Sequence, residues 1–327
     1  MGIAAVVVLL LVIQPSRFAT AVSHFSLAVI PVIALLSVCY YLLQGVRWWT
    51  LLRAVDVHEP LGDTILINYA GQATGLLPLG ELTRAVILTD VADAHFGSVV
   101  ATITVQELIY TLIIIALGVP GSIGYHAADV GMLSAFGGTC LILLILTVPG
   151  VVFWIASMME RVSFLCRAAS ELRKLHLSTV ALLQRWDTWL YSVLSVFGAL
   201  VMVTAFWVII ENLDPGLLSW QQAAFVYAVA TVVGAATLSP GGLGSFEAAA
   251  IGLLYTFGAT AAVALAAALL MRVADKGLAT FLGIICYLVV RVRYGKRNVR
   301  LFRQTSRINK GTGSSGSSSG SAGAGAS

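Results

Sequence analysis

Charged residues are scarce in this chain. Asp, Glu, Lys and Arg together make up 10% of its 327 residues, 59% are hydrophobic, and the mean hydropathy is +0.94. A soluble domain carries about 25% charged residues, because its surface must be hydrated. The composition therefore excludes a soluble globular protein and indicates an all-α, multi-pass membrane protein.

Other features that the sequence lacks narrow the function. Cysteines are few and scattered, with no spacing typical of a metal site or a disulfide framework: Cys39, Cys140, Cys166 and Cys286. We find no Ser/His/Asp or Cys/His set and no nucleotide-binding loop. No basic segment precedes the apolar run Met1–Ile13, so a cleavable signal peptide is not expected. We expect no metal, no cofactor and no nucleic-acid partner, and a transporter rather than an enzyme.

Long apolar runs predict the membrane spans. A hydrocarbon core of about 30 Å needs about 20 helical residues. Runs of this length, with a shorter one at the N-terminus, predict six spans at 3–18, 25–46, 97–118, 131–157, 188–210 and 260–290. Two other regions resemble pairs of shorter helices, 61–77 with 80–94 and 219–238 with 245–258. We predict two re-entrant hairpins there, the alternative being full spans with proline kinks.

The placement of Lys and Arg predicts the sidedness. Five basic residues lie in 158–187 and eight in 291–310, whereas 119–130 and 211–218 contain none. By the positive-inside rule the first two regions are cytoplasmic, including the C-terminus. The two hairpins then enter from opposite faces, as an inverted repeat requires.

Three further segments complete the expected organisation. Residues 1–310 form one transmembrane domain, and 311–327 form a flexible Gly/Ser/Ala tail typical of a linker. Within the domain, 163–187 has an apolar stripe with basic residues beside it, which predicts a helix lying on the inner leaflet. The alternative is a cytoplasmic linker packed on the spans. Arg47-Trp48-Trp49 is expected to be an interfacial anchor.

Two helix-breaking motifs interrupt the apolar segments. One is Leu238-Ser239-Pro240-Gly241-Gly242-Leu243-Gly244-Ser245-Phe246-Glu247, and the other is Gly75-Leu76-Leu77-Pro78-Leu79-Gly80-Glu81-Leu82-Thr83-Arg84. In lipid, an unwound backbone is tolerated only where protein or a water-filled cavity satisfies its polar groups. Broken helices in both halves of a chain are typical of a transporter's binding site. We therefore predict a polar cavity near the midplane of the bilayer.

Ionisable residues near these motifs are the candidate site. Each costs at least about 2.5–3.5 kcal/mol at bilayer depth, so each needs a reason. The predicted substrate-binding residues are Glu81, Arg84, Glu107, Gly241, Gly242, Gly244, Ser245, Glu247, Arg272 and Lys276. Ser245 is the expected N-cap of a helix, which puts Glu247 in its first turn. Arg272, Asp275 and Lys276 share a helix face.

A structural alternative stays open for these charges. They would neutralise one another in buried pairs and only brace the bundle. Asp275 would then pair with Arg272 or Lys276, and Glu107 with Arg84 or Arg272. In the functional interpretation, Arg84, Arg272 and backbone N–H groups hold a phosphate. Glu81 and Glu247 gate the cavity or carry protons.

At these residues the chain resembles the transmembrane region of lysylphosphatidylglycerol synthases and its stand-alone, flippase-like relatives. The resemblance extends over roughly 25–290. It rests on Leu77-Pro78, Gly80-Glu81, Arg84, Glu107, Ser239-Pro240-Gly241-Gly242-Leu243-Gly244, Glu247 and Arg272. Two positions differ from the family pattern, Gly75 where Asn is frequent and Leu108 where Arg is frequent. The synthases carry a soluble aminoacyl-transfer domain after this region, and we do not expect its chemistry here.

The resemblance implies that lipids, or lipid-linked anionic head groups, move between the leaflets of a prokaryotic cytoplasmic membrane. Membrane lipids, anionic or phosphate-bearing, are then the partners, with a homo-oligomer or a separate synthase as further candidates. One alternative is an ion- or proton-coupled transporter of a small soluble solute. Another is a membrane-embedded lipid-modifying enzyme with Glu81, Glu107 or Glu247 as general base. A third is a structural partner that positions a separate synthase.

Overall fold

The computed structural model describes residues 25–75, 77, 80–92, 94–122, 126–161, 166–237 and 242–294. Residues 25–287 and 288–294 belong to separate units, and the second is a short helical piece. All secondary structure in the described residues is helical, which confirms the predicted fold class. The predicted span 3–18 lies outside the described residues.

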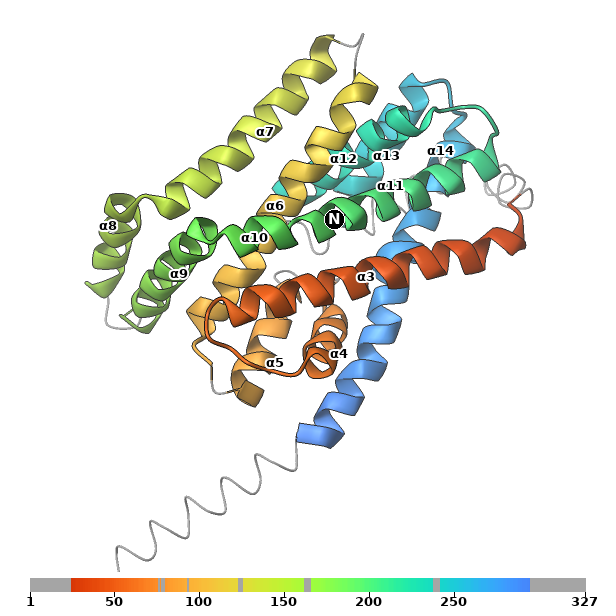
Figure 1. The fold of residues 1–327 in the computed structure, drawn as a ribbon. Coiled ribbons are helices and arrows are strands. Elements are labelled where there is room, and N and C mark those ends of the chain that lie inside the picture. Colours follow the sequence, from red (N-terminus) through yellow and green to blue (C-terminus); the bar gives the residue numbers. More distant parts are fainter. Residues whose placement is uncertain are drawn as a thin grey trace, which may run out of the picture. The chain divides into compact units, whose positions relative to one another are not determined.

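The helices follow one another with short connections (Figure 1). In order they are η1 (Leu27–Val29), α3 (Ile30–Arg53), α4 (Leu61–Gln72), η2 (Gly80–Leu82), α5 (Thr83–Ala92), α6 (Phe96–Ser122), α7 (His126–Thr147), α8 (Pro149–Glu160), α9 (Cys166–Gln184), α10 (Trp186–Tyr191), α11 (Val193–Leu213), α12 (Trp220–Ala236), α13 (Ser245–Thr256), α14 (Ala261–Arg272) and the π-helix η5 (Val273–Gly277).

Four helical segments in the described residues are long and apolar enough to cross a membrane. They are Leu27–Arg53, Phe96–Ser122, Trp186–Leu213 and Ala261–Tyr294. These segments agree with four of the six predicted spans, 25–46, 97–118, 188–210 and 260–290. The total of six is not confirmed.

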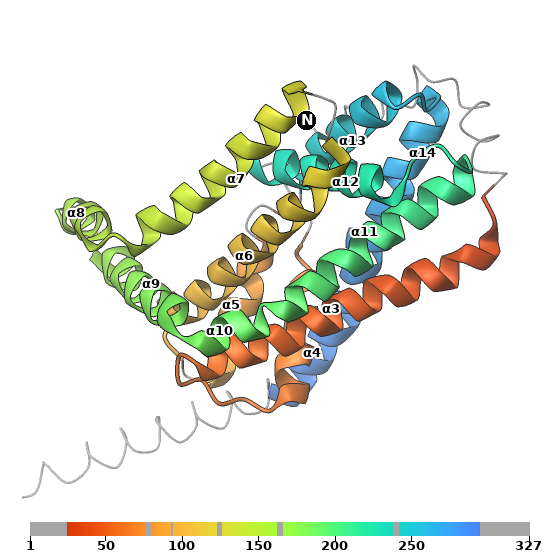
Figure 2. The same ribbon diagram turned by 45° about the horizontal axis from the view of Figure 1, so that its top comes forward.

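The predicted span 131–157 is divided between two helices. Val148 has an extended backbone, with φ −81° and ψ 108°, and Pro149 begins α8. A proline lacks the N–H that would continue the helix and disfavours helical geometry at the residue before it. As a result α7 ends at Thr147, and α8 turns away from it (Figures 1 and 2).

The core brings helices from both halves of the chain together. α3 lies beside α11, and α6 packs along α12 (Figure 2). Small residues allow this close approach: a side chain at Gly121 of α6 would collide with the carbonyl of Gln221 at the start of α12. In the same way, Gly283 leaves room for α4, since a Cβ there would lie 2.7 Å from the carbonyl oxygen of Tyr69.

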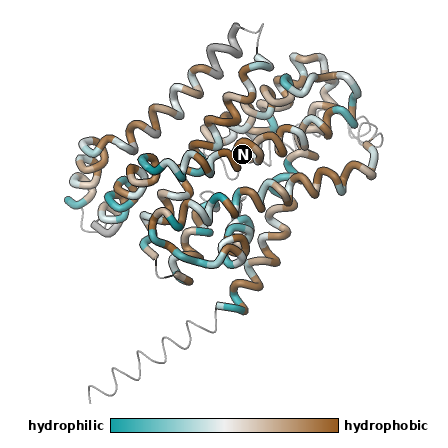
Figure 3. The backbone as a smooth tube through the Cα atoms, viewed as in Figure 1, coloured by the Kyte–Doolittle hydropathy of each residue, from teal (hydrophilic) through white to brown (hydrophobic). Residues whose placement is uncertain are grey.

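Apolar side chains also cover much of the outside. Large hydrophobic residues are exposed along α3, α7 and α8, among them Leu35, Leu133 and Trp154. Apolar surface of this extent is unstable in water and is typical of a face that contacts lipid. Hydrophilic residues gather instead at α9 and at the connection between α3 and α4 (Figure 3). The protein is therefore an integral membrane protein.

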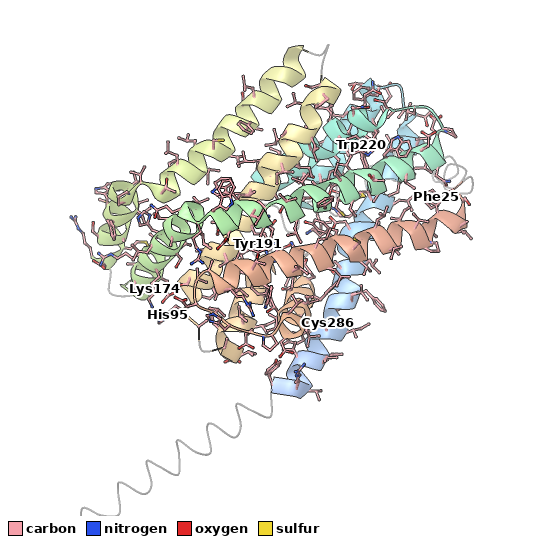
Figure 4. All side chains as sticks on the ribbon, in the orientation of Figure 1. Phe25, His95, Lys174, Tyr191, Trp220 and Cys286 are labelled. Atoms are coloured by element: carbon pink, nitrogen blue, oxygen red, sulfur yellow. The ribbon has the colours of Figure 1, made fainter. Side chains whose placement is uncertain are left out.

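The helix predicted at 163–187 is α9, which packs against α6 and α8. The N–H of Gly97, in the first turn of α6, donates to Oε2 of Glu171 at 2.6 Å. Lys174 lies 3.2 Å from the other oxygen of Glu171 and 3.3 Å from Nδ1 of His95 (Figure 4). Glu171 thus satisfies one of the N–H groups that a helix start leaves without a partner. Trp186, expected on the apolar stripe, is 78% exposed and begins α10.

We expect Glu171→Ala to lower the free energy of unfolding by about 1–2 kcal/mol, because α6 loses a charged cap. Burial opposes ionisation of Glu171, but the Gly97 N–H and Lys174 outweigh it, so the pKa of this carboxyl lies below its usual value. A depressed pKa in the folded state gives stability that is present above the unfolded pKa of about 4.3 and lost as the pH falls. Thermal unfolding in detergent at neutral and acidic pH measures both effects.

The control is Glu160→Ala, which removes an exposed ion pair with Arg173 on the neighbouring helix. Such pairs contribute about 0–1 kcal/mol. An equal loss for both variants would contradict the capping role of Glu171.

Candidate functional site

The first break lies between α4 and α5. The hydroxyl of Thr74 donates to that of Thr83 at 2.6 Å, so it links the end of one helix to the start of the next. A side chain at Gly80 would collide with the carbonyl of Thr74, so only glycine fits there. The chain can therefore turn back on itself within a few residues. Pro78 of this motif lies outside the described residues.

Arg84 is the centre of a first charge cluster, made of Arg84, Glu81, Glu107, Asn68 and Lys276. The guanidinium is fully buried and lies 3.0 Å from Glu107 Oε1 and 3.8 Å from Glu81 Oε2. It also donates to Asn68 Oδ1 at 2.7 Å. The ammonium of Lys276 lies 3.4 Å from Glu81 Oε1. The predicted alternative that Glu107 pairs with Arg84 is confirmed.

The first charge cluster is buried on one side and open on the other. The side chain of Arg84 is 0% exposed, whereas those of Glu81, Glu107 and Lys276 are 33%, 38% and 23% exposed. These three residues come from η2, α6 and η5. These three side chains are therefore the accessible part of the cluster, and Arg84 is its enclosed centre.

The second break precedes α13. Gly244 has φ +86°, a conformation that favours glycine, and its N–H donates to Oε2 of Glu247 at 2.6 Å. Gly244 is therefore the N-cap, and the prediction that Ser245 holds this position was wrong. Gly244, with its positive φ, is the last non-helical residue, so the helix begins one residue earlier than predicted. Ser245 instead begins the helix, and its hydroxyl receives a hydrogen bond from Thr237 at 2.7 Å. Gly241 lies outside the described residues.

Arg272 and Glu247 form a second charge cluster with Gly242. The Nε of Arg272 lies 2.6 Å from Oε1 of Glu247, and Nη2 donates to the carbonyl of Gly242 at 2.8 Å. The side chains of Glu247 and Arg272 are 3% and 13% exposed, and the guanidinium covers the ring of Phe246 at 4.6 Å. One arginine thus satisfies both the carboxylate and a carbonyl of the broken backbone. In this state the N–H of Gly244 is held by Glu247 rather than being free for an anion.

One helix connects the two clusters. Arg272 and Lys276 lie about one turn apart, and the π-helix η5 begins directly after Arg272. Between them, Asp275 accepts a hydrogen bond from the Tyr41 hydroxyl at 2.7 Å. Among the described residues, Asp275 forms no ion pair with Arg272 or Lys276, so that predicted alternative was wrong. The π-turn redirects neighbouring side chains, so that Arg272, Asp275 and Lys276 reach three different elements.

The two breaks repeat the same contacts. Gly71-Gln72-Ala73-Thr74 and Gly234-Ala235-Ala236-Thr237 share the pattern Gly-x-Ala-Thr. In each, the threonine hydroxyl oxygen also lies near the glycine carbonyl oxygen three residues earlier, at 3.2 and 3.1 Å. Each threonine also contacts the hydroxyl that begins the next helix. Our sequence reasoning missed this repeat, which aligning the two halves of the chain would have revealed.

The ion pair that follows each break also recurs, with its charges exchanged. Arg84 of α5 pairs with Glu107 of α6, 23 residues later. Glu247 of α13 pairs with Arg272 of α14, 25 residues later. Each pair joins the helix after the break to the long helix that follows it. Exchanging the two charges leaves each pair neutral. Both halves of the chain therefore neutralise the charge beside the break, although they use different residues.

Arg47 is a site residue that the sequence analysis placed elsewhere. It is 1% exposed and donates to the carbonyl of Gln106 at 3.1 Å and to the hydroxyl of Ser195. Trp48 is fully buried as well, so these two residues are not interfacial anchors. Arg47 and Glu107 line a cavity of ≈ 10 Å³, room for about one water. The sequence offered one signal that Arg47 is buried: Gln44, three positions earlier, is a polar residue on the same helix face.

Comparison with known families identifies the family of the chain. A family model described as the lysylphosphatidylglycerol synthase TM region matches residues 1–307. The match includes both breaks and both charge clusters. No curated protein matches the chain.

We expect Arg272→Met to destabilise the protein by about 3–5 kcal/mol, because Glu247 is left buried without its cation. The double variant Glu247→Gln/Arg272→Met should recover most of this loss, since the introduced amide is neutral and its oxygen still accepts from the Gly244 N–H. Thermal unfolding of the two single variants and the double variant in detergent measures the coupling. Simple addition of the single effects would show that the pair is not a unit.

Proposed function

Because the chain belongs to the lysylphosphatidylglycerol synthase transmembrane family, we propose that it moves a lipid or lipid-linked anionic head group between leaflets. Membership makes it a membrane protein with a lipid-related function. The observation that carries the proposal is the pair of charge clusters, one at each helix break, that share the helix containing Arg272 and Lys276.

The repeated contacts support an inverted repeat of two re-entrant hairpins. α4, α5, α12 and α13 contain 12, 10, 17 and 12 residues. At 1.5 Å per residue they extend about 15–26 Å, which is short of the roughly 30 Å core. The distribution of Lys and Arg places the hairpins on opposite faces. In this arrangement the two breaks approach the midplane from opposite leaflets.

The head-group phosphate would first meet the open side of the first charge cluster. Lys276 is the accessible cation there, and its pair with Glu81 is partly exposed, so an anion can compete for it at modest cost. Arg84 lies behind, fully buried, and Glu107 is its accessible partner. The phosphate would replace Glu81 and then Glu107 as acceptors of these cations. The acyl chains would stay in the lipid around the apolar outer faces.

Release on the other side would involve the second charge cluster. Lys276 and Arg272 lie on one helix, so a movement at the π-turn changes both ion pairs together. π-turns are frequent at functional sites, because their weaker hydrogen bonding permits a local change of register. Glu81 and Glu247 act as gates in this scheme. We propose a transporter rather than an enzyme, since Glu81, Glu107 and Glu247 each already hold a cation.

We expect Glu81→Gln and Lys276→Gln to slow leaflet exchange of a phosphate-bearing lipid about tenfold or more, while the protein stays folded. Lys276→Gln removes the cation that first meets the phosphate, and Glu81→Gln removes the carboxylate that acts as the gate. Both side chains are partly exposed, so neither loss leaves a deeply buried charge. The measurement is exchange of fluorescent lipids with different head groups in liposomes containing the purified protein.

The matched control is Glu160→Gln, an exposed glutamate at the end of α8. Exchange rates equal to the parent in folded Glu81 and Lys276 variants would refute the site. Uptake of a soluble solute without exchange of any lipid would favour the small-solute transporter instead.

A further inference from the structure

Two candidate spans meet at one end. The segment Leu27–Arg53 ends where the segment Trp186–Leu213 begins, and α10 contacts α3. Because both segments are candidate spans, we expect these ends to lie at the boundary between hydrocarbon and head groups. By the predicted sidedness this boundary faces the cytoplasm. None of the charged residues of the two charge clusters lines the cavity at this junction.

A cavity of ≈ 200 Å³ opens at this junction. One water needs about 10–15 Å³ of such space, so the cavity has room for a phosphate ester with accompanying waters. Thr188 lines it and is 2% exposed, and its hydroxyl has no hydrogen-bond partner within the part of the chain that the structure describes. A buried hydroxyl without a partner is costly and indicates that a polar group completes the site.

The cavity lining carries a net positive charge. The guanidinium of Arg53 lies 4.0 Å above the ring of Trp49, and no carboxylate of the described residues is within 4.0 Å of it. Arg185 pairs with Asp187 at 3.5 Å, both exposed. Two arginines and one aspartate leave one uncompensated positive charge. That charge matches a single phosphodiester, which carries one negative charge.

Exposed apolar side chains continue from the cavity along α10 and into α11. Trp186, Trp189 and Leu190 are 78%, 46% and 54% exposed, and Val193 is 48% exposed. Tyr191, which also lines the cavity, is 39% exposed (Figure 4). Trp and Tyr are enriched at membrane interfaces, where one end contacts lipid and the other water. A free anion would not bury this apolar surface, whereas acyl chains attached to a head group would cover it.

We propose that this cavity, lined by Arg53, Arg185 and Thr188, binds the phosphodiester head group of an anionic phospholipid from the cytoplasmic leaflet. Arg53 and Arg185 donate to the phosphate oxygens, and Thr188 supplies the third hydrogen bond. Trp49 holds the guanidinium of Arg53 in place. The site holds a resident lipid beside the helix bundle and is not a step of leaflet exchange.

The test is native mass spectrometry of the full chain in detergent with graded phosphatidylglycerol or phosphatidylcholine. We expect the parent to retain phosphatidylglycerol in preference to phosphatidylcholine. Thr188→Val, Arg53→Ala and Arg185→Ala should each weaken retention about tenfold, the effect of losing one hydrogen bond to a charged group. Thr188→Val has nearly the same shape as the parent, so it tests the site even if an arginine variant misfolds.

The control Arg173→Ala removes an exposed arginine of α9 outside the cavity and should retain the lipid as the parent does. A separate arm adds excess inorganic phosphate, which should not displace the lipid. Equal retention of both lipids, or unchanged retention in folded Thr188→Val and Arg53→Ala, would overturn the proposal. Displacement by inorganic phosphate would also overturn it, because the cavity would then be a free-phosphate site.

Discussion

The constraint on which the structure depends is the cost of charge at bilayer depth. Each ionised side chain there costs several kcal/mol unless an opposite charge and hydrogen bonds meet it. The chain meets this constraint by pairing its charges with one another and with polar groups beside the interrupted helices. Arg272 binds both Glu247 and the carbonyl of Gly242, and Arg84 binds Glu107 and Asn68. The same contacts neutralise the charges and fix the broken backbone.

The long helix of α14 and η5 has a special position because it contacts both helix breaks. Its Arg272 belongs to the second charge cluster and its Lys276 to the first, about one turn apart. Asp275 between them is held by Tyr41 of α3. A regular helix would direct residues at these spacings to one face. The π-turn lets them diverge, so a local change in this helix acts on both breaks at once.

Local signals allowed the sequence to predict the breaks, four spans and the charged residues beside the breaks. Clustered proline and glycine within an apolar segment favour a break in the helix, and charges in an apolar run are conspicuous. Partner choice could not be predicted in the same way. Whether Asp275 pairs within its helix or with Tyr41 depends on the π-turn and on the position of α3. Arg47 looked interfacial because two tryptophans follow it, yet it lies on a buried face of α3. The end of α7 at Thr147, before Pro149, was visible in the sequence and was overlooked because the run stays apolar.

The two charge clusters differ in burial, and therefore in the free energy needed to break their ion pairs. The Glu81–Lys276 pair is the more accessible one, with side chains 33% and 23% exposed. Breaking a buried pair such as Glu247–Arg272 costs about 3–5 kcal/mol. In the proposed scheme, an anion would therefore exchange with the first charge cluster before the second one opens. The second opens only when something replaces both the carboxylate and the Gly242 carbonyl as partners of Arg272. This difference gives an order to the two clusters although their contacts repeat, because exposure rather than pairing decides which one a ligand can enter.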